Sequence, residues 1–139
     1  MLTTSINYLA ILVAAIVAFA VGGLWYSPVL FGKAWAKLSG MNEKDMKKAK
    51  QKGMAKSYVL MFMGSLVMAY VLANLLSLVG ATNLTQALTL ACWLWIGFFI
   101  TTMLGTVLWE GKPWALYFIN VLYYLVNLIV MASILVSWP

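Results

Sequence analysis

The last apolar stretch of the sequence carries the polar residues that are best placed to do chemistry. Tyr117, Asn120, Tyr124 and Asn127 follow one another at intervals of three, four and three residues. Two phenols and two amides therefore share one face of a helix. In an apolar environment these groups need hydrogen-bond partners. They either bond to neighbouring helices or line a permeation path or ligand pocket, and the spacing leaves both interpretations open.

Counting inward from the nearest connection predicts which helices these residues meet. Asn120 lies at the same depth as Thr101 and Thr102 in the preceding apolar stretch. We therefore expect a hydrogen bond between Asn120 and this threonine pair, worth about 0.6 kcal/mol on average. Asn127 lies deeper, at about the level of residues 70–74.

Groups that perform acid–base, nucleophilic or metal chemistry are scarce. The sequence contains no His, one Cys and three acidic residues, so it offers no zinc site and no Ser-His or Cys-His pair. The single Cys92 allows no disulfide framework, and Glu110 is the one acid that borders an apolar stretch. There is no Gly-rich phosphate loop. We expect a chain without enzymatic activity, metal or cofactor.

The composition of the chain is that of a membrane protein. Of its 139 residues, 65% are hydrophobic and 9% are charged, whereas a soluble domain has about 45–50% apolar and about 25% charged residues. Every charged residue lies between Lys33 and Lys56 or at Glu110 and Lys112. The uncharged blocks that remain must therefore hold the membrane spans.

These uncharged blocks predict four membrane helices. A span needs about 20 apolar residues, so the long block 57–109 must divide at a turn near residues 80–83. The expected fold class is all-α: a single integral membrane domain over residues 1–139, folded as a four-helix bundle. The spans are expected at about residues 6–28, 57–79, 87–109 and 113–136.

The placement of lysine predicts the orientation in the membrane. Residues 29–56 carry eight of the nine Lys and, with Glu43 and Asp45, the whole net charge of +6. By the positive-inside rule this loop is cytoplasmic. With four spans, both termini then face outside.

The segment after the first span contains a proline followed by a regular pattern of apolar residues. Pro28 lacks a backbone donor and disfavours helix at Ser27, so the first span should end or kink there. Beyond it, Phe31, Trp35 and Leu38 recur at helical spacing, with lysines between them. This pattern predicts a short amphipathic interfacial helix between spans one and two.

The corner between the first span and this helix is a second candidate site. It is either a rigid connection anchored by aromatic rings at the headgroup level, or a site for a lipid headgroup or another anion, with Lys33 as counter-ion. Ser27 is expected to cap the following turn. The residues of this corner are Trp25, Tyr26, Ser27, Pro28, Phe31, Lys33 and Trp35.

The remaining residues of the basic loop indicate what kind of molecule the loop binds. Asn42 followed by Asp45 marks a helix start, and the lysines from Lys47 to Lys56 would each be attracted to anionic headgroups by about 1 kcal/mol. A nucleic-acid partner is disfavoured because the chain has no Arg for bidentate contacts. Anionic membrane lipid is the expected partner.

Small residues recur every four positions in the first three spans. The row in the first span is Ala10, Ala14, Ala18 and Gly22, and the third span carries Gly97, Thr101 and Gly105. Such rows let helices approach closely in lipid. There are more of them than one bundle needs, which predicts a homo-oligomer.

The stretch from Gly23 to Trp35 reads Gly-Leu-Trp-Tyr-Ser-Pro-Val-Leu-Phe-Gly-Lys-Ala-Trp. With the Met- and Lys-rich segment and three spans that follow, it resembles the family of small membrane proteins catalogued as domain of unknown function 1761. The resemblance implies a four-span protein of the bacterial inner (plasma) membrane. It implies no established activity and no catalytic residues.

Two classes of function fit these observations. The first is an oligomeric channel or transporter that passes a small solute along Asn120, Tyr124 and Asn127. The second is a non-catalytic membrane component that organises a partner protein or anionic lipid through its basic loop. Flux of solute would indicate the first, and binding to the basic loop would indicate the second.

The predicted orientation can be measured by cysteine labelling in intact cells. With Cys92 replaced by Ser, Glu43→Cys should resist a membrane-impermeant maleimide added outside, whereas Asn83→Cys should react, because the lysine bias places the two positions on opposite sides. Labelling of position 43 from outside would show that the orientation is reversed.

Overall fold

The computed structural model describes residues 6–139, apart from the side chains of residues 43, 46, 49 and 50, and this part of the chain is helical, without strands. Four helical segments are long and apolar enough to cross a membrane, and each begins and ends within three residues of its expected position. The all-α membrane bundle is therefore confirmed. The elements are α1 (Tyr8–Trp25), α2 (Gly32–Leu38), α3 (Glu43–Gln51), α4 (Ala55–Leu78), α5 (Leu84–Leu94), the π-helix η1 (Trp95–Ile100), α6 (Thr101–Met103), α7 (Gly105–Leu108) and α8 (Trp114–Ser137).

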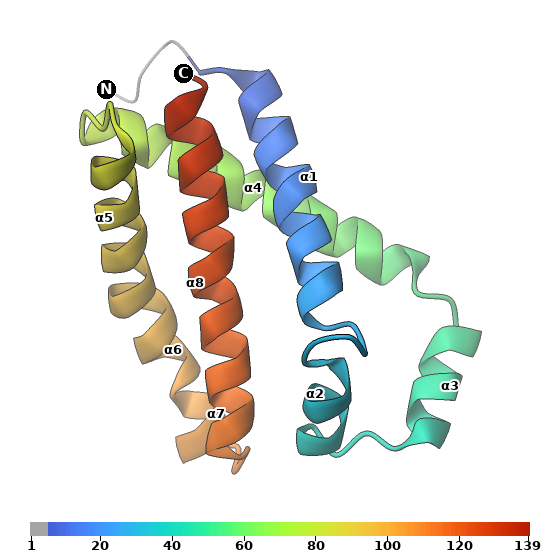
Figure 1. Cartoon of the computed structure of the whole chain (residues 1–139). Helices are drawn as coiled ribbons and strands as arrows, with labels where there is room; N and C mark the ends of the chain where they lie inside the picture. The colour runs from blue at the N-terminus through green and yellow to red at the C-terminus, as the bar shows by residue number, and fades with distance from the viewer. Residues whose placement is uncertain (1–5) are drawn as a thin grey trace.

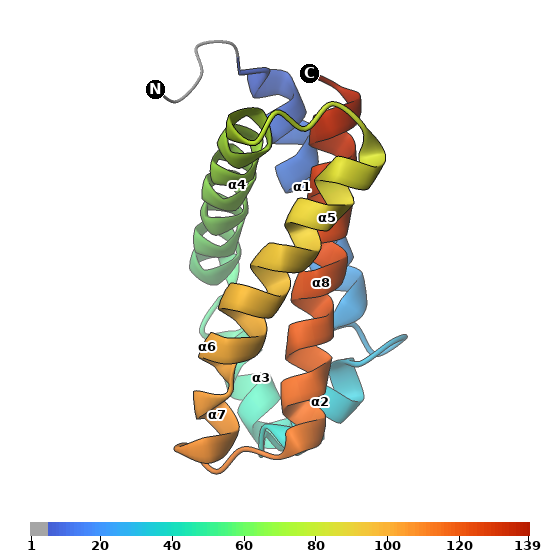
Figure 2. The ribbon, with the colours of Figure 1, turned by 90° about the vertical axis from the view of Figure 1, so that its left-hand side faces the viewer.

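The long helices are arranged around α8 (Figures 1 and 2). The third span (α5 to α7), α8 and α1 lie side by side with α8 in the middle, and α4 crosses obliquely over one face of this layer. α8 contacts α1, α4, α5 and η1, and α2 packs against it as well. The helix with the polar stripe is thus the shared neighbour of the other spans.

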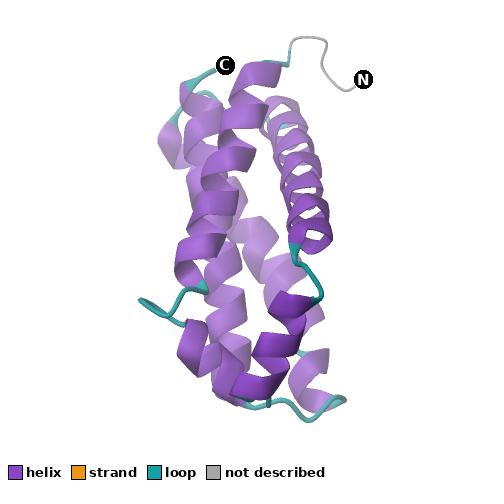
Figure 3. Ribbon diagram, turned by 90° about the vertical axis from the view of Figure 1, so that its right-hand side faces the viewer, coloured by secondary structure: helices purple, strands orange, loops and turns teal. Residues whose placement is uncertain are grey.

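The two ends of the bundle differ in character. The start of α1 and the end of α8 lie together at one end, whereas α2, α3 and the connection from α7 to α8 lie at the other (Figures 1 and 3). The basic segments therefore collect at the end opposite the described termini.

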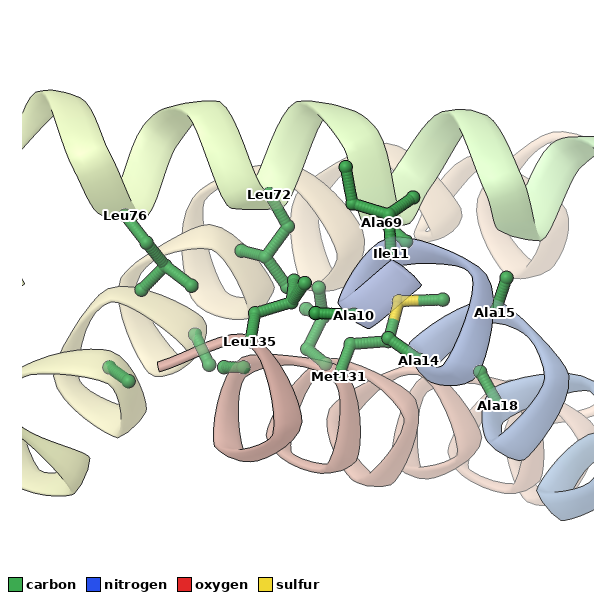
Figure 4. Close-up of a cluster of buried hydrophobic side chains, with 14 residues drawn as sticks. Ala10, Ile11, Ala14, Ala15, Ala18, Ala69, Leu72, Leu76, Met131 and Leu135 are labelled. Carbon is green, nitrogen blue, oxygen red and sulfur yellow. The ribbon is translucent and has the colours of Figure 1, made fainter. Parts of the chain in front are cut away.

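The interior of the bundle is packed with small side chains (Figure 4). Ala10, Ala14 and Ala18 of α1 are at most 1% exposed and belong to one cluster with Ala69 of α4 and Met131 of α8. Small side chains let these helices approach closely, so that dispersion forces hold them together in lipid. The small residues of the first span are thus used inside the bundle.

Two of the small residues in the row on the third span are not used in this way. Gly97 and Thr101 are exposed, and a Cβ added at Gly97 would meet nothing within 4 Å. The first residues of α4 are also unpacked, because residues 51–61 are all exposed. A homo-oligomer that covers these surfaces remains a prediction.

The third span is not the uninterrupted helix that its hydropathy predicts. Six residues, Trp95 to Ile100, form a π-helical stretch between α5 and α6. A π turn shifts the hydrogen-bond register, which changes where backbone carbonyls point. In this chain one of those carbonyls, of Ile100, is bonded by the Tyr117 hydroxyl of α8.

The corner after α1 is built by the backbone as the Pro28 rule predicts. α1 ends at Trp25, and the amide of Gly32 donates to the carbonyl of Ser27 at 2.8 Å to close the loop. The Ser27 hydroxyl donates to the carbonyl of Leu24 at 2.7 Å. Ser27 therefore caps the end of α1, and the expectation that it caps the following turn is wrong.

The short helix expected after this corner is present as α2, and the start signal of the next helix is also confirmed. The amide of Asp45 donates to Asn42 Oδ1 at 2.8 Å, and the amide of Asn42 donates to Asp45 Oδ2 at 3.3 Å, at the start of α3. The aromatic face of α2 is turned toward the protein, since Trp35 contacts Tyr26 edge-on. α2 is therefore a packed part of the bundle.

Gly32 is required for this corner because of a close approach. A Cβ at Gly32 would lie against the carbonyl oxygen of Tyr26 and 2.7 Å from that of Ser27, whereas a Cβ at Gly23 would meet nothing within 4 Å. Gly32→Ala should therefore lower the free energy of unfolding by about 1–3 kcal/mol, measured in detergent. The control Gly23→Ala should leave it unchanged or raise it slightly, since Ala favours helix. Equal stability of the two variants would contradict the close approach.

Candidate functional site

The first part of the candidate site joins the corner after α1 to α8. The hydroxyl of Tyr26 donates to Asn120 Oδ1 at 2.8 Å, and the indole N–H of Trp25 donates to the carbonyl of Ile119 at 3.1 Å. Both bonds link residues 94 positions apart in the sequence. They hold the end of α1 against the first half of α8.

Aromatic contacts reinforce the same junction. The ring of Tyr26 lies 5.3 Å from that of Tyr123, and the ring of Trp25 lies 4.7 Å from that of Phe31, centroid to centroid. The approach of Tyr123 is possible because Gly22 has no side chain: an added Cβ there would come within 2.8 Å of the Tyr123 hydroxyl. The corner is thus an aromatic cluster fixed to α8 by two hydrogen bonds.

A second set of contacts joins α8 to the third span. The indole N–H of Trp95 donates to the carbonyl of Val121 at 2.6 Å, and the Tyr117 hydroxyl donates to the carbonyl of Ile100 at 2.7 Å. The ring of Tyr124 stacks on Phe99 at 4.8 Å with an interplanar angle of 27°. Three polar or aromatic contacts therefore fix η1 against α8.

The expected bond between Asn120 and the threonine pair is wrong. Thr101 and Thr102 are exposed, and their hydroxyls donate to the carbonyls of Gly97 and Phe98 one turn earlier in their own helix. Asn120 bonds to Tyr26 instead. The rotation of the third span about its axis, which decides where Thr101 and Thr102 point, cannot be obtained from residue counts.

The deepest member of the stripe meets α4. Asn127 is 3% exposed, and its amide Nδ2 lies 3.6 Å from the sulfur of Met68, close to the predicted level. Its Oδ1 accepts no hydrogen bond from the described residues. Asn127 is thus the one stripe residue with an unpaired buried acceptor.

The stripe on α8 therefore divides among three neighbours. Asn120 bonds to the end of α1, Tyr117 and Tyr124 contact the third span, and Asn127 contacts α4. Phenols and amides in these contacts hold helices together in a medium without water. The contacts favour a structural role over a polar lining.

Two contributors were missed in the sequence. Trp95 belongs to neither candidate site of the sequence and Tyr123 lies outside the spacing of the stripe, yet Trp95 bonds to α8 and Tyr123 fills the space beside Gly22. The row of small residues on α1 indicates that a large side chain can approach at Gly22, but it does not indicate which residue supplies that side chain.

The basic residues of the corner point away from this junction. Lys33 and Lys37 are exposed on α2, while Gly32 and Ala36 of the same helix are buried. The carboxylate of Asp45 is engaged with the backbone of Asn42. Pro28 is exposed in the connecting loop. Lys33 is therefore placed to meet an anion from outside the protein.

The described residues do not bring three His, Cys, Asp or Glu side chains together as metal ligands. Comparison with known proteins gives one match: the sequence model of the family described as "Protein of unknown function (DUF1761)" covers residues 9–136. No curated protein and no solved structure matches the chain.

The bond between Tyr26 and Asn120 can be tested by a double-mutant cycle on the free energy of unfolding. Tyr26→Phe and Asn120→Leu should each destabilise the protein, and the double variant should be less destabilised than their sum, with a coupling of about 0.6 to 1.7 kcal/mol. As a control, Tyr58→Phe should be additive with Asn120→Leu, because the Tyr58 hydroxyl contacts Met54. Additivity of the first pair would show that the bond does not contribute.

Proposed function

Because the chain belongs to the DUF1761 family, whose function is not known, we propose a function from the geometry: a non-catalytic membrane component that organises anionic lipid through its lysine-rich segment. The proposal places residues 29–56 in the cytoplasm of a bacterial-type plasma membrane, as the positive-inside rule predicts.

The main support for this proposal is that lysines gather at one end of the bundle. α2, α3 and the connection from α7 to α8 lie together at the end away from the described termini (Figure 1), and their lysines with described side chains are exposed. These are Lys33, Lys37, Lys44, Lys47, Lys48 and Lys112. Each exposed lysine near an anionic surface contributes about 1 kcal/mol of attraction.

Because α2 is held in place, its lysines attract anionic lipid to a defined position on the protein and not only through the net charge of the chain. Ala36 is 7% exposed and α2 packs on α8, so Lys33 and Lys37 project from a helix that is held by the core. Lysines on a held helix lose less freedom on binding than lysines on a flexible chain. This favours lipid headgroups that meet α2 at a defined place.

Passage of a small solute through an oligomer is the second candidate. The unpaired Oδ1 of Asn127 favours it, because a buried polar group inside a membrane often marks a path. The other members of the stripe are bonded or stacked within one chain, which favours the lipid-binding proposal.

The lipid-binding proposal is tested in reconstituted bilayers with spin-labelled phosphatidylglycerol and phosphatidylcholine. The wild-type protein should prefer the anionic lipid, and the preference should weaken with salt as the Debye length falls from about 10 Å at 0.1 M to about 3 Å at 1 M. Lys33→Glu with Lys37→Glu should reduce the preference by about 2 kcal/mol through the lost attraction, and further through repulsion of the two added carboxylates. The control Lys112→Glu should reduce it less, because Glu110 already stands nearby in the sequence.

Equal association of the two lipids with the wild-type protein would reject the proposal. Solute flux that is lost in Asn120→Leu with Asn127→Leu, at unchanged folding, would favour the channel instead. The two measurements therefore separate the two candidate functions.

A further inference from the structure

α1 is shorter than α8, and the missing length lies at the lysine-rich end. The two helices are level at the other end, because the side-chain amide of Asn7, which caps α1, donates to the carbonyl of Trp138 at 3.3 Å. From this end α1 extends over 18 residues and α8 over 24, so α1 ends about 9 Å before α8 begins. The bond from Tyr26 to Asn120 gives the same offset, since Asn120 lies six residues after Trp114, the first residue of α8.

This offset places the corner below the ordinary surface of the hydrocarbon layer. α8 is about 36 Å long and the layer is about 30 Å thick, so a centred α8 extends about 3 Å beyond the layer at each end. Lys112 and Trp114 at its start are of the residue types that mark the headgroup level. The corner, about 9 Å further in, therefore lies about 6 Å below the surface of the layer. α2 continues from it toward the lysine-rich end beside α8 (Figure 1).

The backbone of the corner needs partners that hydrocarbon does not supply. Residues 28–31 form a non-helical loop and are exposed. The amides of Leu30 and Gly32 donate to the carbonyl of Ser27 at 3.1 and 2.8 Å, but the carbonyls of residues 28–30 accept no hydrogen bond from the described part of the chain. Exposed backbone without partners is not found in hydrocarbon. Water and lipid headgroups must therefore reach this loop.

Lys33 has the same requirement. It follows Gly32, whose amide is bonded to the corner, so Lys33 lies at the level of the corner, and its side chain is exposed. An ammonium group in hydrocarbon is costly, and local thinning of the bilayer is one way in which membranes accommodate it. A span shorter than the hydrocarbon layer thins the bilayer as well. α1, about 27 Å long, is such a span.

The side chains of the loop indicate where the hydrocarbon begins. Val29 is 81% exposed and Leu30 is 47% exposed, and Figure 3 shows the loop extending sideways from the bundle. Adjacent exposed apolar side chains are unfavourable in water and favour contact with acyl chains. The boundary between acyl chains and headgroups therefore fits between this apolar tip and Lys33, at the corner itself.

We propose that the corner draws the headgroup layer about 6 Å inward on the α1 side of the bundle, with a phospholipid phosphate held by Lys33 and acyl chains packed against Val29 and Leu30. The leaflet is thinned at this place, whereas beside the third span it keeps its ordinary level. The inference rests on the proposed contact of Lys33 with lipid headgroups and adds its depth and its chemical group. Zwitterionic phospholipids also carry a phosphate, so the thinning does not require anionic lipid.

The test measures the depth of spin labels in phosphatidylcholine bilayers, from their accessibility to oxygen and to a water-soluble nickel chelate. In a Cys92→Ser background, labels at Val29→Cys and Phe98→Cys are compared, since both side chains are exposed. Phe98 lies at a similar level of the bundle, between the two residues of the third span that bond to residues 117 and 121 of α8. The label at position 29 should lie about 6 Å closer to the phosphates than the label at position 98.

The role of Lys33 is tested with the label kept at position 29. Lys33→Leu should leave this label further from the phosphates, because no charge then draws them inward. The matched control Lys37→Leu should leave the depth unchanged, since Lys37 lies about one helical turn further from the corner. An unchanged depth in Lys33→Leu would overturn the assignment of the phosphate to Lys33.

A tilt of the whole molecule would also bring position 29 closer to the phosphates, and two labels at the opposite end separate it from thinning. Tyr8 and Leu84 are the first residues of α1 and α5, and both are exposed. Thinning at the corner leaves labels at these positions equally deep, whereas a tilt makes the label on α1 the deeper one. Unequal depths at this end would therefore overturn the proposal.

Equal depths at positions 29 and 98 would overturn the proposal, since the leaflet would then have one thickness around the bundle. A label at position 29 that neither oxygen nor the nickel chelate reaches would also overturn it, because the tip would then be covered by protein, such as a second copy of the chain. All depths are measured without anionic lipid, so failure here is distinct from failure of the preference for phosphatidylglycerol.

Discussion

A polar side chain inside a bilayer has no water to bond to, so its partner must be another group of the protein. In this chain most of these hydrogen bonds between spans involve α8. The corner after α1 bonds to Asn120 and to the carbonyl of Ile119, and the third span bonds through Trp95 and Tyr117. Because the hydrophobic effect does not draw helices together in lipid, these bonds and the close packing of small residues determine where each span docks. The order of the helices around α8 follows from them.

Close packing of small residues and hydrogen bonds act in different parts of the bundle. α1 and α4 meet α8 through small residues such as Ala14 and Ala69, which are fully buried, and this side forms the core. The third span adds Ala87 and Ala91, also fully buried, to this core. Hydrogen bonds and the stacking of Tyr124 on Phe99 hold its second half. The lysines of α2 lie beyond the corner that Tyr26 fixes, so their position depends on how this corner is held to α8.

The sequence predicted the four spans, the corner at Pro28 and the start of α3, because each depends on local rules: hydropathy over about 20 residues, the missing donor of proline, and an Asn-Asp capping pair. It predicted the stripe on α8 from spacing alone. The partner of Asn120 was wrong, because Thr101 is exposed and bonds to the carbonyl of Gly97 in its own helix. Tyr26 was assigned to the corner at the headgroup level, and Trp95 was not singled out. Their bonds to α8 depend on helix rotation and crossing, which a single sequence does not encode locally.

The contacts of Asn120, Tyr117 and Tyr124 with neighbouring helices imply that water does not reach the polar face of α8. This can be measured as the accessibility of that face to a water-soluble reagent. In a Cys92→Ser background, single cysteines at positions 120, 124 and 127 would be exposed to a water-soluble thiosulfonate from both sides of a reconstituted membrane, with Lys112→Cys as the reactive control. We expect position 112 to react and the three α8 positions to remain unmodified. Reaction at positions 124 and 127 at a rate near that of position 112 would contradict it.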